Sequence, residues 1–245
     1  MDILIFVISF VASFVFALGG VGAAIILIPI LVSLGIPINT AKPVGLFFNT
    51  VSMTGASITN IKNRRLDFKV GIPIIVTSFI FAVAGAYISK FIPETIILTL
   101  FILFLLFSGF MFLFHKKSEK ENYRDDTPIL SLSVVGAFAG VVSGMLGIGG
   151  GGIISPLMLM LGYNPKKIAA ITAFVVPFSS FSGFLTYWAM GRIDWDILLI
   201  VSVAGVVGAT LGTALMHKKL KPQTVKKILA VILLFMAAKL LINIF

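Results

Sequence analysis

The sequence predicts an all-α integral membrane protein built from two inverted repeats of about five segments each. Of its 245 residues, 59% are hydrophobic and 11% are charged, and the mean hydropathy is +1.13. Soluble domains average about half apolar and a quarter charged. The charged residues fall in short clusters between apolar stretches of about 20 residues, the length of helix that crosses a hydrocarbon core of roughly 30 Å. Soluble enzymes, disordered tails and DNA-binding modules are therefore excluded.

The basic residues lie where membrane topology signals belong. The net charge is +10, but Lys and Arg sit at the ends of the apolar stretches, so we expect a lipid bilayer as the partner and no nucleic acid. The first 17 residues lack a positive leading region and run into further apolar sequence, so we expect a retained membrane segment. With no cysteine, the chain has no disulfide framework and no thiolate chemistry.

Two apolar segments are too long for one crossing. Residues 2–34 and 128–161 would each extend for roughly 50 Å as a helix, against roughly 30 Å of hydrocarbon. Both are interrupted near the middle by glycines. The remaining stretches each match one bilayer, at approximately 42–61, 70–89, 94–114, 168–189, 196–216 and 223–244.

The chain aligns with itself at an offset of 127 residues. Gly20-Val21-Gly22 then falls on Gly147-Ile148-Gly149, and Pro29 falls on Pro156. The sequence therefore predicts repeat 1 over residues 1–114 and repeat 2 over 128–245, joined by a polar linker over 115–127.

The distribution of basic residues predicts that the two repeats are inverted. If each over-long segment crossed the bilayer once, Lys and Arg would divide almost equally between the two sides. If each segment is a glycine-tipped hairpin of two short helices, one side holds four basic residues and the other holds the remaining 15 of the 19. The positive-inside rule then places the linker in the cytoplasm and both termini outside. The four are Lys42, Lys90, Arg192 and Lys239.

The glycine breaks are the predicted substrate site. Non-helical backbone at membrane depth is tolerated where protein buries it or a watery cavity faces it. The helices that follow the breaks would direct free N–H groups and positive dipole ends toward the midplane, which favours a small anion. The structural alternative is that these glycines serve close helix packing. The glycines concerned are Gly19, Gly20, Gly22, Gly147, Gly149, Gly150, Gly151 and Gly152.

Hydroxyl and amide side chains near the breaks would complete the site, although hydrogen bonds within or between helices are the alternative for each. We select Asn49, Ser52, Ser155, Thr172 and Ser179 from a wider set that includes Thr50, Thr54, Ser143 and Ser180. Lys42 is included as a cation at the start of a span, with snorkelling to the interface as its alternative. The paired loop residues Arg65, Asp67, Arg192 and Asp194 match across the repeats, and we expect them to form turns and anchor helices.

The predicted membrane spans contain no acidic residue and no histidine in their interior, which limits the possible functions. Every acidic residue and both histidines lie at span ends or in loops, so we expect no buried proton relay, no metal site, no cofactor and no enzyme. The remaining interpretation is a secondary carrier that exports a small anion by alternating access. An anion channel is the first alternative, and a membrane-embedded enzyme or assembly factor is a weaker one.

With the repeat in place, the sequence resembles the TauE/SafE family of sulfite and organosulfonate permeases, also called TSUP. The resemblance rests on a glycine-rich stretch followed by proline in each half, namely 19–22 before Pro29 and 147–152 before Pro156, and on Gly191-Arg192-Ile193-Asp194-Trp195. The small-residue run 208–212 is also similar. Repeat 1 departs from the pattern, with Ala23 and Ala24 where repeat 2 has Gly150 and Gly151.

This resemblance implies a multi-pass transporter of the cell membrane that acts on small sulfur-containing or carboxylate anions, often by export. Sulfite, an organosulfonate and acetate all fit these expectations equally. A homo-oligomer is compatible with the sequence. Because the first repeat is the one that departs from the family pattern, we expect the glycines of the second break to matter more for substrate.

Overall fold

The computed structural model describes residues 2–16, 22–114, 123–191, 193–219 and 222–244. All regular secondary structure in these residues is helical. This agrees with the all-α class expected from the sequence. The elements are α1 (Asp2–Phe16), α2 (Ala24–Ser33), α3 (Ile38–Lys62), α4 (Phe68–Ile88), a short 3-10 turn η1 (Ser89–Phe91), α5 (Glu94–Phe114), α6 (Ile129–Leu146), α7 (Gly151–Met160), α8 (Pro165–Ala189), α9 (Trp195–Lys219) and α10 (Pro222–Ile244).

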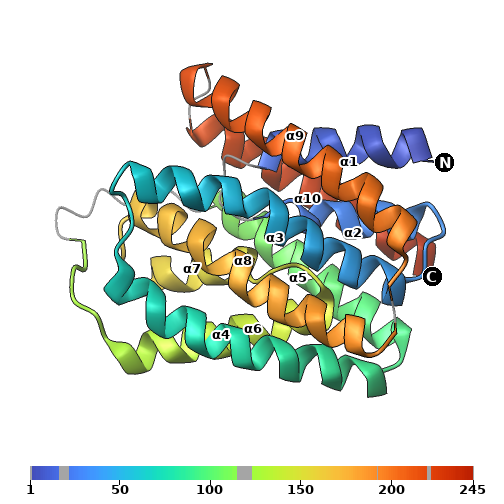
Figure 1. Cartoon of the computed structure of the whole chain (residues 1–245), viewed down its shortest axis with the longest axis horizontal. Helices are drawn as coiled ribbons and strands as arrows, with labels where there is room; N and C mark the ends of the chain where they lie inside the picture. The colour runs from blue at the N-terminus through green and yellow to red at the C-terminus, as the bar shows by residue number, and fades with distance from the viewer. Residues whose placement is uncertain (1, 17–21, 115–122, 192, 220–221, 245) are drawn as a thin grey trace.

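Each over-long apolar segment consists of two helices with an interruption between them. The segment 2–34 contains α1 and α2, and the segment 128–161 contains α6 and α7. The chain after α7 returns to the start of α6, where the N–H of Arg124 donates to the carbonyl of Gly162 (3.0 Å). In Figure 1 the loop after α2 lies at the end of the bundle that carries the N-terminus, and the loop after α7 lies at the opposite end. The two interruptions therefore enter the bundle from opposite ends.

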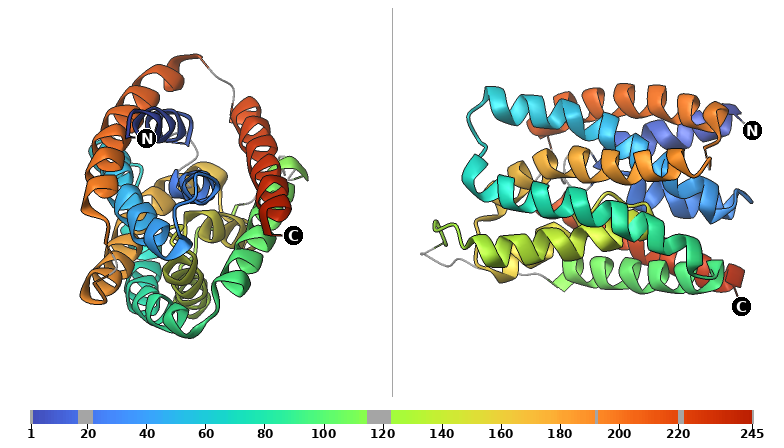
Figure 2. Two further views of the ribbon diagram at one scale, coloured as in Figure 1. Left: turned by 90° about the vertical axis from the view of Figure 1, so that its right-hand side faces the viewer. Right: turned by 60° about the horizontal axis from the view of Figure 1, so that its bottom comes forward.

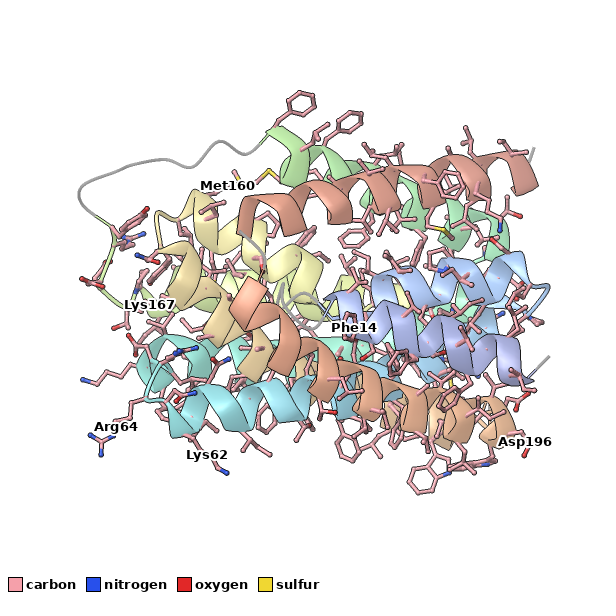
Figure 3. The ribbon with its side chains drawn as sticks, turned by 90° about the horizontal axis from the view of Figure 1, so that it is seen from above. Phe14, Lys62, Arg64, Met160, Lys167 and Asp196 are labelled. Carbon is pink, nitrogen blue, oxygen red and sulfur yellow. The ribbon has the colours of Figure 1, made fainter. Side chains whose placement is uncertain are left out.

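The outside of the bundle suits a bilayer. Four of the described segments are long and apolar enough to cross a membrane, namely Phe68–Phe91, Glu94–Met111, Ile129–Leu146 and Lys167–Ala189. On α4, large apolar side chains such as Ile72, Val76 and Ile80 are more than half exposed, as expected for a surface that faces lipid. Figure 3 shows Lys62, Arg64 and Lys167 near one end of the bundle and Asp196 near the other. The protein is thus a multi-pass membrane protein.

The long helices pack in pairs around the short ones. The main contacts join α4 to α6, α1 to α9, α3 to α8 and α5 to α10, and Figure 2 shows α2 inside the ring that the long helices make. Small residues bring α4 and α6 close together, since side chains at Gly136, Gly140 and Gly144 would overlap the backbone of α4. Close packing through small residues is the usual contact between membrane helices. The packing leaves the two breaks in the interior, where every described residue is buried.

Candidate anion site at the helix breaks

Glycines in the left-handed conformation form the second break. Gly147 ends α6 with φ +81°, and Gly149 and Gly150 follow at φ +77° and +72° before α7 begins. Residues with a β-carbon rarely adopt these angles. In the first break Gly22 has φ +86°. The predicted site residues Gly19 and Gly20 lie outside the described residues.

Asn49 connects the two breaks. This fully buried side chain of α3 accepts a hydrogen bond from the N–H of Ala24 through Oδ1 (3.0 Å) and donates one from Nδ2 to the carbonyl of Ile148 (2.8 Å). Ala24 is the first residue of α2, so the amide oxygen satisfies one of the N–H groups that a helix start leaves without a partner. A β-carbon at Gly22 would lie 2.7 Å from Asn49 Oδ1, and one at Gly149 would also overlap the amide. Glycine at both positions is therefore what admits Asn49.

Three serines lie close to the glycines of the second break. Ser179 Oγ contacts the carbonyl of Gly149 at 3.4 Å and that of Val176 in its own helix at 3.2 Å. A β-carbon at Gly149 would come within 2.6 Å of Ser180 Oγ, and one at Gly150 would lie 3.5 Å from the β-carbon of Ser143. Both of these serines are fully buried, and neither hydroxyl has a hydrogen-bond partner. The second break is therefore lined by donors that the described protein groups do not use.

The other predicted hydroxyls contact protein groups and not the residues of the breaks. Ser52 bonds back to the carbonyl of Phe48 in its own helix (2.7 Å), while Ser155 of α7 and Thr172 of α8 contact each other at 3.3 Å. The structure thus brings Asn49 and Ser179 to the breaks together with the glycines. Ser143 and Ser180, which the sequence offered only within the wider set, lie at the centre.

Lys42 is held inside the bundle beside the second break. Its side chain is fully buried, and a β-carbon at Gly147 would lie 2.7 Å from its Cα. The ammonium donates to Ser89 Oγ (3.4 Å) and lies 5.4 Å from the centre of the Tyr187 ring. The Tyr187 hydroxyl in turn lies 2.7 Å from Ser89 Oγ and donates to the carbonyl of Gly144 (3.0 Å). Protein groups therefore enclose the Lys42 side chain, and its ammonium lies beside residues near the ends of α4 and α8.

The matched loop residues act at helix starts. Asp67 precedes α4 and accepts from the N–H groups of Lys69 and Val70 (3.1 and 3.4 Å). Asp194 does the same for α9, accepting from the N–H of Ile197 (3.1 Å). Arg65 is exposed in the loop between α3 and α4, and Arg192 lies outside the described residues. Both aspartates thus cap a helix, as side-chain oxygens at this position commonly do.

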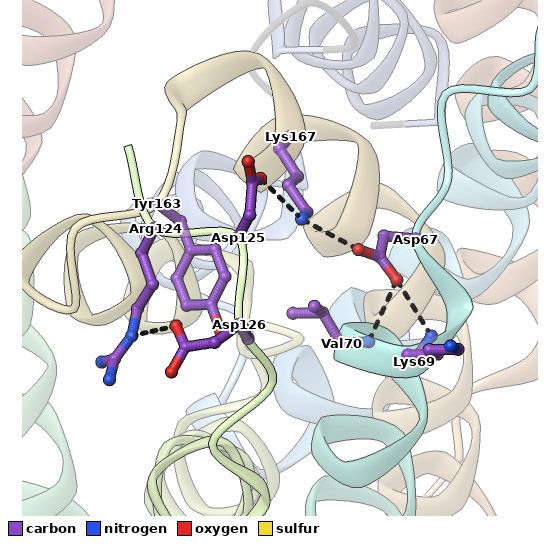
Figure 4. A network of polar contacts seen from close by, with 8 residues as sticks. All are labelled: Asp67, Lys69, Val70, Arg124, Asp125, Asp126, Tyr163 and Lys167. Atoms are coloured by element: carbon purple, nitrogen blue, oxygen red, sulfur yellow. Dashed lines mark hydrogen bonds and ion pairs between the residues drawn. The ribbon is translucent and has the colours of Figure 1, made fainter. Parts of the chain in front are cut away.

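Asp67 also pairs with a cation from the other half of the chain. Lys167 Nζ lies 2.8 Å from Asp67 Oδ2 and 3.5 Å from Asp125 Oδ1 (Figure 4). These two ion pairs join the start of α8 to the α3–α4 loop and to the end of the linker. Burial raises the pKa of Asp67, but the Lys167 ammonium and the backbone N–H groups of Val70 and Lys69 outweigh burial and hold this pKa below its ordinary value of 3.8.

A helical bundle with lipid-facing sides, and with broken helices meeting in its interior, is an architecture found in many multi-pass membrane transporters. The profile described as "Sulfite exporter TauE/SafE" matches residues 5–240, so this chain belongs to the TauE/SafE family.

Relatives in several organisms carry names that agree with this class. A "probable membrane transporter protein" of Methanocaldococcus jannaschii is 26% identical over 94% of this chain and 91% of its own length. One from Bacillus subtilis is 25% identical over 98% of this chain and 97% of its own. An Arabidopsis thaliana protein named "Sulfite exporter TauE/SafE family protein 1" is 33% identical over 52% of this chain and 29% of its own. No solved structure matches. The relatives are named as transporters, and this chain is accordingly a transporter and not an enzyme.

Proposed function

We propose that this protein is a secondary carrier of the cell membrane that exports a small anion, such as sulfite or an organosulfonate, and binds it at the glycine breaks. The observation that carries the proposal is the start of α7. Its leading N–H groups, those of Gly151 and Gly152, donate to no described protein group. Just before them, Ser180 lies beside Gly149 and Ser143 beside Gly150, and both buried hydroxyls are without partners. Helix N-termini with free N–H groups favour anions.

The family and the surrounding charge support an anion as well. The buried Lys42 packs against Gly147 at the break through its α-carbon, and the family to which the chain belongs is described as a family of sulfite exporters. We assign Lys42 the role of balancing the substrate's charge as it reaches the site. Ser179, Ser52, Ser155 and Thr172 lie on the helices around the break and would line the path that leads to it.

Alternating access would follow from an inverted relation between repeat 1 (1–114) and repeat 2 (128–245). The packing of α4 against α6 has its counterpart in α9 against α1, and α3 against α8 and α5 against α10 each join equivalent helices of the two repeats. Such symmetry allows inward- and outward-open states to be exchanged images of each other around a fixed site. The predicted division of 15 basic residues against four supports a cytoplasmic linker with both termini outside.

Export requires no coupled ion under this scheme. An anion leaving an inside-negative cell gains about 2.3 kcal/mol per charge per 100 mV. A uniport of the anion would therefore run outward against a modest concentration gradient.

Flux in liposomes tests the proposal. Purified protein reconstituted with internal sulfite should release it saturably, faster when the outside is made positive, and Gly149→Ala should abolish the release because the added β-carbon overlaps Asn49. Flux that ignores voltage but follows a proton or sodium gradient would contradict uniport. Single-channel currents would favour an anion channel instead. Reporter fusions at either terminus that are active in the cytoplasm would contradict the orientation.

A further inference from the structure

The two breaks differ in what meets the start of the following helix. At α2 the first N–H, that of Ala24, is already bonded to Asn49 Oδ1. At α7 the amide contributes nothing to the helix start, since Nδ2 of the same residue donates to the carbonyl of Ile148 before it. No side chain caps α7. A protein oxygen therefore caps the first helix start, and no described side chain caps the second.

The hydroxyls around the second break lack partners although they are fully buried. Ser143 of α6 lies beside Gly150 and Ser180 of α8 lies beside Gly149, so two separate helices each bring a buried hydroxyl without a partner to this break. Buried polar atoms without a hydrogen bond are rare in native proteins, and here two of them lie at the same helix break. Both hydroxyls can donate, as can the N–H groups of Gly151 and Gly152.

The two repeats also differ in sequence at the positions that face the breaks. At the offset of 127 residues, Ser143 corresponds to Phe16 and Ser180 to Met53, so the first repeat has no hydroxyl at either place. Asn49 corresponds to Val176, so the second repeat has no amide to fill its own break. The hydroxyl donors occur in one repeat and the internal acceptor in the other.

We propose that the breaks are unequal and that the carrier binds one anion per chain, at the start of α7. There the hydroxyls of Ser143 and Ser180 and the N–H groups of Gly151 and Gly152 donate to the anion's oxygens. Asn49 Oδ1 takes the position of an anion oxygen at the start of α2 and closes that half to substrate. This inference rests on the proposed function as an anion carrier. It adds the number of anions bound per chain and names Ser143 and Ser180 as residues that determine the affinity for the anion.

The neutral charge of Asn49 fits this arrangement. A carboxylate in the same place would satisfy the N–H of Ala24 equally well, but it would put a negative charge beside the substrate and repel it. An amide supplies the acceptor without that charge, and it also supplies the donor that Ile148 uses.

Calorimetric binding to the purified full-length protein tests the inference, with sulfite and methanesulfonate as probes. The wild type should bind one anion per chain. Ser143→Ala and Ser180→Ala should each weaken binding by about tenfold to one hundredfold, the range for a hydrogen bond to a charged group. Ser108→Ala is the matched control because that serine is also buried and without a partner but lies on α5, and its affinity should equal that of the wild type.

Different outcomes separate the inference from the function on which it rests. Two anions per chain, or full affinity in both serine variants, would overturn the inference and leave the carrier function intact. No binding of either probe, together with no flux of either probe from liposomes, would overturn both. If the alanine variants fail to fold, Ser180→Cys replaces them, because it keeps the approximate size of the side chain and has a weaker donor. This variant should still bind the anion more weakly than the wild type. Unchanged affinity in Ser180→Cys would also overturn the inference.

Discussion

Asn49→Leu should destabilise the protein measurably, because it removes a side chain that bonds to both breaks. The two side chains are of similar size, so the change leaves little cavity. It does leave the N–H of Ala24 and the carbonyl of Ile148 buried without this partner. A buried group that loses its hydrogen bond costs about 1–3 kcal/mol, so the pair should cost about 2–6 kcal/mol.

Thermal unfolding in detergent measures this loss through the fluorescence of Trp188 and Trp195. One kcal/mol shifts the melting temperature by about 2–4 °C for a protein of this size, so the variant should melt at least ~4 °C lower. Thr50→Val is the matched control. That hydroxyl lies next to Asn49 on α3 and bonds only to the carbonyl of Leu46 within its own helix, so its loss should change the melting temperature little.

An equal melting temperature in Asn49→Leu and the wild type would refute the reasoning. It would mean that water already satisfies the two backbone groups, and that the breaks meet without depending on the amide.

Three further outcomes follow from the same geometry. Asn49→Asp should lose methanesulfonate binding at pH 8, because the carboxylate repels the anion and cannot donate to the carbonyl of Ile148. Acidification should restore binding, since the neutral acid carries no charge and can donate again; binding that is independent of pH would contradict this. Gly149→Ala should lower the yield of folded protein, since its φ of +77° and the overlap with Asn49 both oppose a β-carbon; wild-type yield would count against the close approach. Asp67→Asn should lower stability at pH 7 by up to about 1 kcal/mol, as expected for a partly exposed pair with Lys167. Because the pKa of Asp67 is lowered in the folded protein, its contribution to stability is complete above about pH 3.8 and is lost as the pH falls below that value. The melting temperatures of variant and wild type should therefore converge in acid. A difference that stays constant with pH would contradict the pairing.

Several features could be predicted from the sequence because they depend on local composition. Apolar stretches of bilayer length predict helices, and α4, α5, α6 and α8 contain segments long enough to cross. A segment too long for one crossing, with glycines in its middle, predicts an interruption, and α6 ends at Gly147. The family resemblance is confirmed over residues 5–240.

The partners of individual polar side chains could not be predicted in this way. Asn49 and Ile148 are 99 positions apart. Lys42 of α3 contacts Ser89 of η1 and Tyr187 of α8, so this cluster joins three different elements. Nothing in the local pattern around Ser89 or Tyr187 distinguishes them from other polar residues on apolar helices. Such contacts depend on how far each helix is rotated about its axis and on which helix lies beside it.

The sequence by itself determined that this chain lies in a membrane, that two of its apolar segments are interrupted by glycine, and that it resembles one transporter family. These follow from hydropathy, segment length and local motifs, which neighbouring residues set together. The tertiary structure decided that the breaks meet at Asn49, and that Ser143 and Ser180 are left without partners there. The physical reason is that a hydrogen bond is decided by ångström-scale positions, and for groups on separate helices only the packing of the whole bundle fixes those positions.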